Sequence, residues 1–231
     1  MVQVYAVRLD KTLGKSEYDI LMSHVLAEKQ ERISRFYRFE DAQRTLIGDI
    51  LTRYLICKRL NISNNMLEFG LTEYGKPYLC GRKEIHFNIS HSGEWVVGCI
   101  DNLPVGIDVE KIEPIDISIA GRFFSREEFE GLKAKNLTLR KEYFYELWTL
   151  KESYIKAVGK GLSIPLDSFT IRIEKDNITA YAAGKPERYY LRQYYLDENY
   201  KMAVCAKSNY FESNVEICKI NEIYEKFLTV L

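Results

Sequence analysis

A helical pattern that occurs twice, about a hundred residues apart, constrains the fold of this chain more than any other feature. Residues 41–60 carry two adjacent rows of apolar side chains at i, i+4 spacing, and residues 140–158 carry an apolar arc beside a polar row. A loop and strands follow each helix, and similar strands occur at 94–100 and 201–206. This weak internal repeat predicts an α+β fold of two pseudo-symmetric α/β halves, 1–103 and 104–231, with a site at their interface. Each half would pack its long helix against a small, mostly antiparallel sheet.

Shorter patterns predict the remaining elements. Asp41 is placed to cap the first long helix, and Ser125 with Glu128 forms a capping-box pattern at the start of another helix. The other predicted elements are strands at 2–9, 105–110, 168–174 and 200–206, a Tyr-rich hairpin at 178–196, helices at 16–24 and 27–39, and a polar helical tail.

Composition narrows the class of partner. The 33 Lys and Arg residues balance 33 Asp and Glu residues, so no overall field attracts nucleic acid or an anionic membrane. Any anion must therefore be bound by locally placed cations. The five cysteines form no C-x-x-C pattern, which favours reduced thiols, and we find neither a signal-peptide pattern nor an apolar run long enough to cross a bilayer. We expect a soluble cytoplasmic protein that binds neither nucleic acid nor membrane.

Two acidic residues alternate with apolar ones in the segment 105–110. Strand geometry places Asp108 and Glu110 on one face and Ile107 and Val109 on the other. Two neighbouring carboxylates in a mostly buried strand repel each other and lose hydration, which a divalent cation would compensate. The alternative is an edge strand with a hydrated acidic face.

The second long helix offers partners for these acids. Trp148, Glu152 and Lys156 share one face, apart from the apolar arc. Taken alone, Glu152 and Lys156 could form a surface pair that contributes a few tenths of a kcal/mol. Beside the acidic strand, however, Glu152 would complete a set of three carboxylates with Asp108 and Glu110. Such oxygen ligands suit Mg²⁺, which typically serves phosphate chemistry.

The same residues carry a family resemblance. The segment Val105-Gly-Ile-Asp108-Val-Glu110, followed by Phe144-x₃-Trp148-x₂-Lys151-Glu152-x₃-Lys156, resembles the paired signature of the 4′-phosphopantetheinyl transferases. The resemblance extends over nearly the whole chain, through segments 36–37, 41–45, 74–77, 87–92 and 160–163. This set is typical of the larger, monomeric, Sfp-type branch, which activates peptide and polyketide synthetases. Nonribosomal peptide and antibiotic biosynthesis are therefore the expected context.

The resemblance implies a reaction and a set of roles. The phosphopantetheine arm of coenzyme A would pass to a serine of an apo peptidyl or acyl carrier protein, releasing adenosine 3′,5′-bisphosphate. Mg²⁺ would bind Asp108, Glu110 and Glu152, with Glu152 as general base and Lys156 stabilising or protonating the leaving phosphate. Trp148 would pack to orient the helix. The residues implied in coenzyme A binding are Lys29, Arg32, Arg44, Lys76, Ser90, His91, Lys151 and Lys156; Arg32 stands where close relatives often have lysine.

The same resemblance places carrier docking on the loop after Gly161, through Leu162, Ile164 and Leu166.

Other interpretations of these residues remain open at this point. A carrier- or coenzyme A-binding module without activity would carry many of the same residues, and Mg²⁺ dependence would separate it from an enzyme. A metal-dependent nuclease would need an acid-x-Lys on one strand face, whereas Lys111 follows Glu110 directly. His91 beside serine could also be an ordinary hydrogen-bonded loop histidine.

Overall fold

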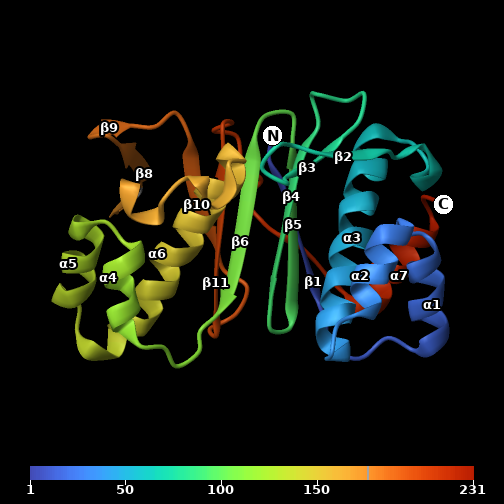
Figure 1. The fold of residues 1–231 in the computed structure, drawn as a ribbon, viewed down its shortest axis with the longest axis horizontal. Helices are drawn as coiled ribbons and strands as arrows, with labels where there is room; N and C mark the ends of the chain where they lie inside the picture. Colours follow the sequence, from blue (N-terminus) through green and yellow to red (C-terminus); the bar gives the residue numbers. More distant parts are fainter. Residues whose placement is uncertain (176) are drawn as a thin grey trace.

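Two lobes lie side by side and meet along their sheets (Figure 1). The computed structural model describes residues 1–175 and 177–231, without the side chain of Leu162. The first lobe contains β1 (Gln3–Arg8), α1 (Lys15–Ser23), α2 (Ala27–Ser34), α3 (Phe39–Leu60), β2 (Phe69–Leu71), β3 (Pro77–Leu79), β4 (His86–Ser92) and β5 (Trp95–Asp101).

The second lobe follows directly in the sequence. It contains β6 (Val105–Lys111), α4 (Ala120–Phe123), α5 (Arg126–Ala134), α6 (Leu137–Val158), β7 (Phe169–Glu174), β8 (Asn177–Ala182), β9 (Lys185–Pro186), β10 (Tyr190–Tyr194) and β11 (Tyr200–Ala206). The chain then returns to the first lobe as β12 (Glu216–Lys219) and α7 (Ile220–Leu228). Within the described residues, none of these helices has the length and apolar character needed to cross a membrane.

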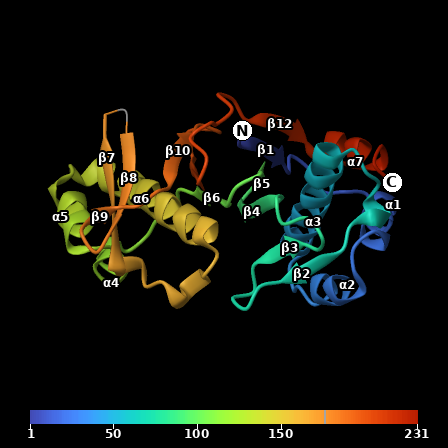
Figure 2. The same cartoon turned by 90° about the horizontal axis from the view of Figure 1, so that it is seen from above.

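The order of layers is helix, sheet, sheet, helix. The first sheet has strand order β12-β1-β5-β4 and the second β10-β11-β6. Seen from above, β4, β5 and β6 lie between α3 and α6 (Figure 2). Alternation along β5 explains how one strand serves two cores: Val96 and Ile100 pack on the α3 side, while Val97 and Cys99 face the other sheet.

Strand β6 shows the same alternation with a different consequence. Val105, Ile107 and Val109 lie in the core between the sheets. The intervening residues therefore point the other way, towards α6. The apolar face of β6 packs in the core between the two sheets. The polar face, with Asp108 and Glu110, is therefore on the side of α6.

The predicted α+β fold class is confirmed, but several local predictions are wrong. Helix α3 begins at Phe39, so its N-cap is Arg38 instead of Asp41. The segment 178–196 forms a hairpin only in part: β8 and β9 pair in antiparallel fashion, whereas β8 also pairs with β7 and β10 pairs with β11. The capping box at Ser125 and Glu128 is confirmed, and Gly159 ends α6 with a left-handed φ of 80°.

The C-terminal segment crosses back over the predicted division at 103/104. Strand β12 pairs in parallel with β1. Helix α7 buries Ile220, Ile223 and Phe227 in the core of the first lobe, so the predicted polar tail has one apolar face. The first lobe therefore includes residues from both predicted halves.

Gly106 permits close packing of β6 on α6. A Cβ atom at this position would lie 2.3 Å from the carbonyl oxygen of Ser153 and 2.3 Å from the amide nitrogen of Ala157. These are backbone atoms of a buried helix, which cannot rotate out of the way. Glycine thus sets the distance between the acidic strand and the helix that carries Glu152 and Lys156.

We expect Gly106→Ala to destabilise the protein by about 3 kcal/mol, because the added methyl group overpacks this contact. The melting temperature should fall by about 6–12 °C. Gly131→Ala in α5 is the matched control, because its Cβ would meet only the Tyr143 hydroxyl at 3.8 Å and alanine favours a helix. Equal melting temperatures for Gly106→Ala and the unchanged protein would contradict this account.

Candidate functional site

Asp108 is the centre of the candidate site. The residue is 3% exposed, and its Oδ1 accepts hydrogen bonds from Ser90 Oγ at 2.8 Å and Lys156 Nζ at 2.6 Å. Lys156 Nζ also donates to Ser90 Oγ at 3.0 Å. Asp108 Oδ2 is buried and has no hydrogen-bond partner among the described residues. One oxygen of this acid is thus held in place, and the other is uncommitted.

The two other predicted acids lie beside Asp108. Burial and the neighbouring Asp108 carboxylate raise the pKa of Glu110 to about 7, with a further contribution from Glu152. The same two causes, burial and Asp108, raise the pKa of Glu152. Asp108 thus acts electrostatically on both of the acids that the sequence predicted to converge with it. Nevertheless, within residues 1–175 and 177–231, no three His, Cys, Asp or Glu side chains lie close enough together to enclose a metal ion.

Lys156 contacts both lobes. Its ammonium contacts Asp108 of β6 and Ser90 of β4, two strands that belong to different sheets. The helix places Lys156 one turn after Glu152, so both side chains reach the same edge of α6. Lys156 thus pairs with the acidic strand β6. It does not form the solvated surface pair with Glu152 that the helix alone would allow.

A pocket of about 390 Å³ adjoins this centre on the side of the first lobe. Of the predicted residues, Lys29, Arg32, Ser90, His91 and Lys156 line it. Lys29 forms an ion pair with Asp49 in α3. Several other residues line this pocket, although the sequence predicted no role for them. Among them are Thr45, Phe69, Phe87 and Asn88. Thr45 and Asn88 lie in segments that carry the family resemblance, which was the available signal.

Lys76 lies at the end of α6. It lines a second pocket, of about 270 Å³, together with Glu152 and Lys156. Its ammonium donates hydrogen bonds to the carbonyl oxygen of Val105 at 3.1 Å and to that of Lys156. Burial lowers the pKa of Lys76. Since the last carbonyl groups of a helix lack partners within it, Lys76 caps α6 from the other lobe.

Arg44 does not line the 390 Å³ pocket. It pairs with Asp41 and donates to the carbonyl oxygen of Gly93 at 2.9 Å, which supports the turn between β4 and β5. It lines a neighbouring pocket of about 260 Å³ with Gln43 and Glu94. Local desolvation and the charge of Arg44 lower the pKa of His91, so Arg44 influences the site from behind this turn.

Lys151 is also placed differently from the prediction. Its side chain is 0% exposed, and its ammonium contacts both carboxylate oxygens of Glu128 at 2.7 Å and the carbonyl oxygen of Phe169 at 2.8 Å. It points into the second lobe, where Glu128 and Phe169 use all three of its donor directions. At about 100° per residue, Lys151 lies only about 40° from buried Leu147 on the helix surface, a signal that could have indicated burial.

The aromatic and loop predictions have mixed outcomes. Trp148 packs against Phe123 and Phe144, with ring centroids 5.5 and 5.7 Å apart, which fits the orienting role. On the expected docking loop, Leu166 is only 6% exposed and belongs to the core of the second lobe. Ile164 is partly buried against the same core, and the side chain of Leu162 lies outside the described part of the chain.

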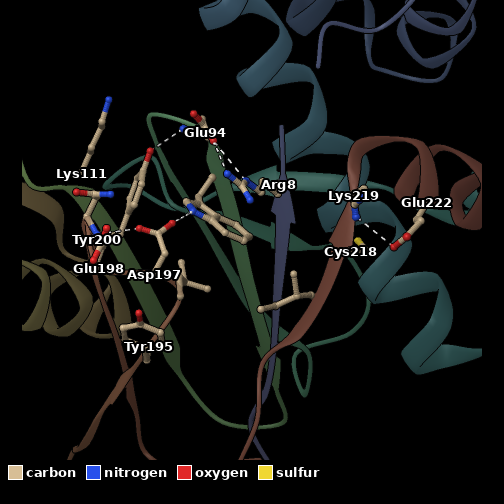
Figure 3. Close-up of a pocket in the computed structure, with 14 residues that line it drawn as sticks. Arg8, Glu94, Lys111, Tyr195, Asp197, Glu198, Tyr200, Cys218, Lys219 and Glu222 are labelled. Atoms are coloured by element: carbon tan, nitrogen blue, oxygen red, sulfur yellow. Dashed lines mark hydrogen bonds and ion pairs between the residues drawn. The ribbon is translucent and has the colours of Figure 1, made fainter. Parts of the chain in front are cut away.

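Another pocket, of about 790 Å³, is lined by a different set of residues (Figure 3). Its polar groups already bind one another: Trp95 Nε1 donates to Asp197 at 2.9 Å, and the amide of Glu94 donates to the Tyr200 hydroxyl at 2.9 Å. Arg8 pairs with Glu94 beside them. Lys111 lines this pocket, whereas the three clustered acids do not. Volume alone therefore does not identify the chemical centre.

Comparison with known proteins agrees with this geometry. Residues 13–101 match the family described as "4'-phosphopantetheinyl transferase, N-terminal", and residues 104–205 match the 4′-phosphopantetheinyl transferase superfamily. A 4′-phosphopantetheinyl transferase of Bacillus subtilis is 45% identical over 96% of this chain and 100% of its own length. The 4′-phosphopantetheinyl transferase Sfp of B. subtilis strain 168 is 41% identical, again over 96% of this chain and all of its own length.

A third relative is the 4′-phosphopantetheinyl transferase gsp of Aneurinibacillus migulanus, 39% identical over 99% of this chain and 96% of its own length. These matches extend through both lobes. The chain therefore belongs to the 4′-phosphopantetheinyl transferase superfamily, a class of transferases, as the paired signature predicted.

Proposed function

We propose that this protein transfers the 4′-phosphopantetheine arm of coenzyme A to a serine hydroxyl of an apo peptidyl or acyl carrier protein. The observation that carries the proposal is the meeting of Asp108, Glu110 and Glu152 with Lys156 beside a cation-lined pocket. Acids and cations at one junction suit a substrate whose phosphates bind both a metal ion and ammonium groups. The relatives, all named for this transfer, support the same reaction.

Coenzyme A would occupy the 390 Å³ pocket with its adenosine and 3′-phosphate end. Lys29, Arg32 and His91 supply positive charge and hydrogen bonds there. Phe69 and Phe87 supply apolar surface for the base. The pyrophosphate would then extend past Ser90 towards Lys156, which lines both this pocket and the neighbouring one with Glu152. A protein with balanced charge can bind this anion because the cations are local.

The chemistry of the residues present suits Mg²⁺, although the described side chains are not gathered closely enough to enclose an ion. Asp108 Oδ2 is buried without a partner among the described residues, and the donor set consists of carboxylate oxygens, which a hard cation prefers. Burial, together with the neighbouring Asp108 carboxylate, raises the pKa values of Glu110 and Glu152, and a bound cation would oppose both effects. Asp108, Glu110 and Glu152 would hold the ion. When bound, Mg²⁺ would neutralise pyrophosphate oxygens and the charge that develops on them.

The chain's own residues would move the proton and stabilise the leaving group. Glu152 would accept the proton of the carrier serine, whose oxygen forms the new bond to the phosphorus of the pantetheine arm. The bond from that phosphorus to the adenosine 3′,5′-bisphosphate breaks, and Lys156 would stabilise or protonate the departing phosphate oxygen. A raised pKa suits Glu152 for proton transfer near neutral pH. We further propose that the protein is a monomer and is cytoplasmic. The free, mostly buried cysteines are in keeping with the second point, a reducing compartment.

The test is a mass-shift assay on a panel of apo peptidyl and acyl carrier proteins. With coenzyme A and Mg²⁺, a carrier should gain one phosphopantetheine mass, and a chelator should abolish the gain. The physiological carrier would be the one modified with the highest kcat/KM. Failure to modify any carrier, together with metal-independent carrier binding, would instead favour an inactive docking module.

A further inference from the structure

Side chains of β4 join the two sheets next to the acids. Asn88, Ser90 and Ser92 alternate along β4, and each forms a hydrogen bond to a residue of β6. Asn88 Oδ1 accepts from the amide of Ile107 at 2.9 Å. The two serines, two positions apart, donate to two acids that are also two positions apart: Ser90 to Asp108 at 2.8 Å and Ser92 to Glu110 at 3.0 Å. Polar side chains thus connect two strands that belong to different sheets.

The hydrogen bonds of Ser92 indicate which group accepts its hydroxyl proton. Its Oγ accepts from the backbone amide of Lys111 at 3.1 Å. A serine hydroxyl has a single proton, so that proton is available to the Glu110 carboxylate, whose Oε2 lies 3.0 Å away. Ser90 uses the same arrangement, because its Oγ accepts from Lys156 and donates to Asp108. Each serine therefore donates to one carboxylate oxygen of its acid and makes no hydrogen bond to the other.

This arrangement would prepare Glu110 for a metal ion. A free glutamate side chain loses rotational freedom when it coordinates, which weakens binding. A carboxylate already held by one oxygen has less freedom to lose. Groups that hydrogen-bond to metal ligands commonly change metal affinity by 10- to 100-fold when they are removed.

We infer that Ser92 is a positioning residue that orients Glu110 for Mg²⁺ binding. The inference rests on the proposed function for the identity of the ion. Ser92 itself would contact neither coenzyme A nor the carrier serine. Its effect would pass through Glu110, as the effect of Ser90 passes through Asp108.

The experiment measures Mg²⁺ affinity directly. Mg²⁺ is titrated calorimetrically into the whole protein, free and saturated with coenzyme A. Ser92→Ala should raise the Kd for Mg²⁺ about 10-fold, and Ser92→Thr, which keeps a hydroxyl, should restore it to within about 2-fold of the unchanged protein. Ser23→Ala is the matched control, because this exposed serine donates only to the carbonyl oxygen of Ile20. It should leave the Kd unchanged.

Transfer assays provide a second readout. Ser92→Ala should need about 10-fold more Mg²⁺ for half-maximal rate, while kcat at saturating Mg²⁺ stays close to that of the unchanged protein. If Ser92→Ala does not fold, Ser92→Cys, with a similar volume and a weaker donor, should show the loss of affinity instead. An unchanged Kd in a folded Ser92 variant without the hydroxyl would overturn the inference. Loss of Mg²⁺ affinity in a protein that modifies no carrier would uphold the inference and reject the transfer reaction.

Discussion

Glu152→Gln is expected to lower the rate of carrier modification by about 10²- to 10⁴-fold, the contribution typical of a general base. The amide has nearly the same shape but cannot take the proton of the carrier serine. The fold should be retained, because burial and Asp108 already disfavour the charged form of Glu152. The melting temperature should therefore stay the same or rise.

The rate is measured in single turnovers by mass spectrometry, at Mg²⁺ and coenzyme A concentrations that saturate each variant. Saturation separates proton transfer from the weaker metal binding that the change would also cause. Glu142→Gln on the same helix is the matched control, because Glu142 forms an exposed pair with Lys201 at 3.2 Å, and such pairs contribute little. A Glu152→Gln rate within tenfold of the unchanged protein would remove Glu152 from the role of base.

Lys151→Met is expected to lower the free energy of unfolding by about 3–5 kcal/mol, because it leaves Glu128 as an unpaired buried charge. Glu128 also accepts hydrogen bonds from the amides of Ser125 and Ile171 at 2.7 Å, so it links α5, β7 and α6. The melting temperature should fall by about 6–20 °C. Below that temperature, the KM for coenzyme A should be unchanged.

Two further variants make this prediction specific. Lys141→Met, at an exposed position of the same helix, should change stability by no more than about 0.5 kcal/mol. Combining Lys151→Met with Glu128→Gln should recover part of the loss, because the buried charge is gone, so the two effects should not add. A raised KM for coenzyme A with an unchanged melting temperature would instead support the pyrophosphate contact that the sequence suggested.

Lys151 and Glu152 are adjacent in the sequence, but their side chains have different surroundings. Both belong to the same signature, yet their side chains are about 100° apart on the helix. Glu152 lies beside Asp108, whereas Lys151 points into the lobe and pairs with Glu128, a residue 23 positions away in the sequence. A sequence motif does not specify where each side chain points. The orientation of the side chain decides which residue can contact the substrate.

Partners distant in the sequence account for the other errors. Each strand of the segment 178–196 has the expected alternation, but alternation does not reveal that β8 pairs with β7 and β10 with β11. Strand β12 likewise finds β1, more than 200 positions earlier. Leu166 lies next to exposed residues in sequence but is buried in the core of the second lobe.

The sequence by itself determined the features that depend on local geometry. Period-two alternation put Asp108 and Glu110 on one face of a strand, and one helical turn put Glu152 and Lys156 on one edge of a helix. Only the tertiary structure decided that the two faces meet. It did so through Gly106, which lets β6 lie directly on α6, and through the serines of β4, which hold the acids from the other sheet. These contacts join residues up to about 50 positions apart, and packing, which no local pattern encodes, selects among such partners.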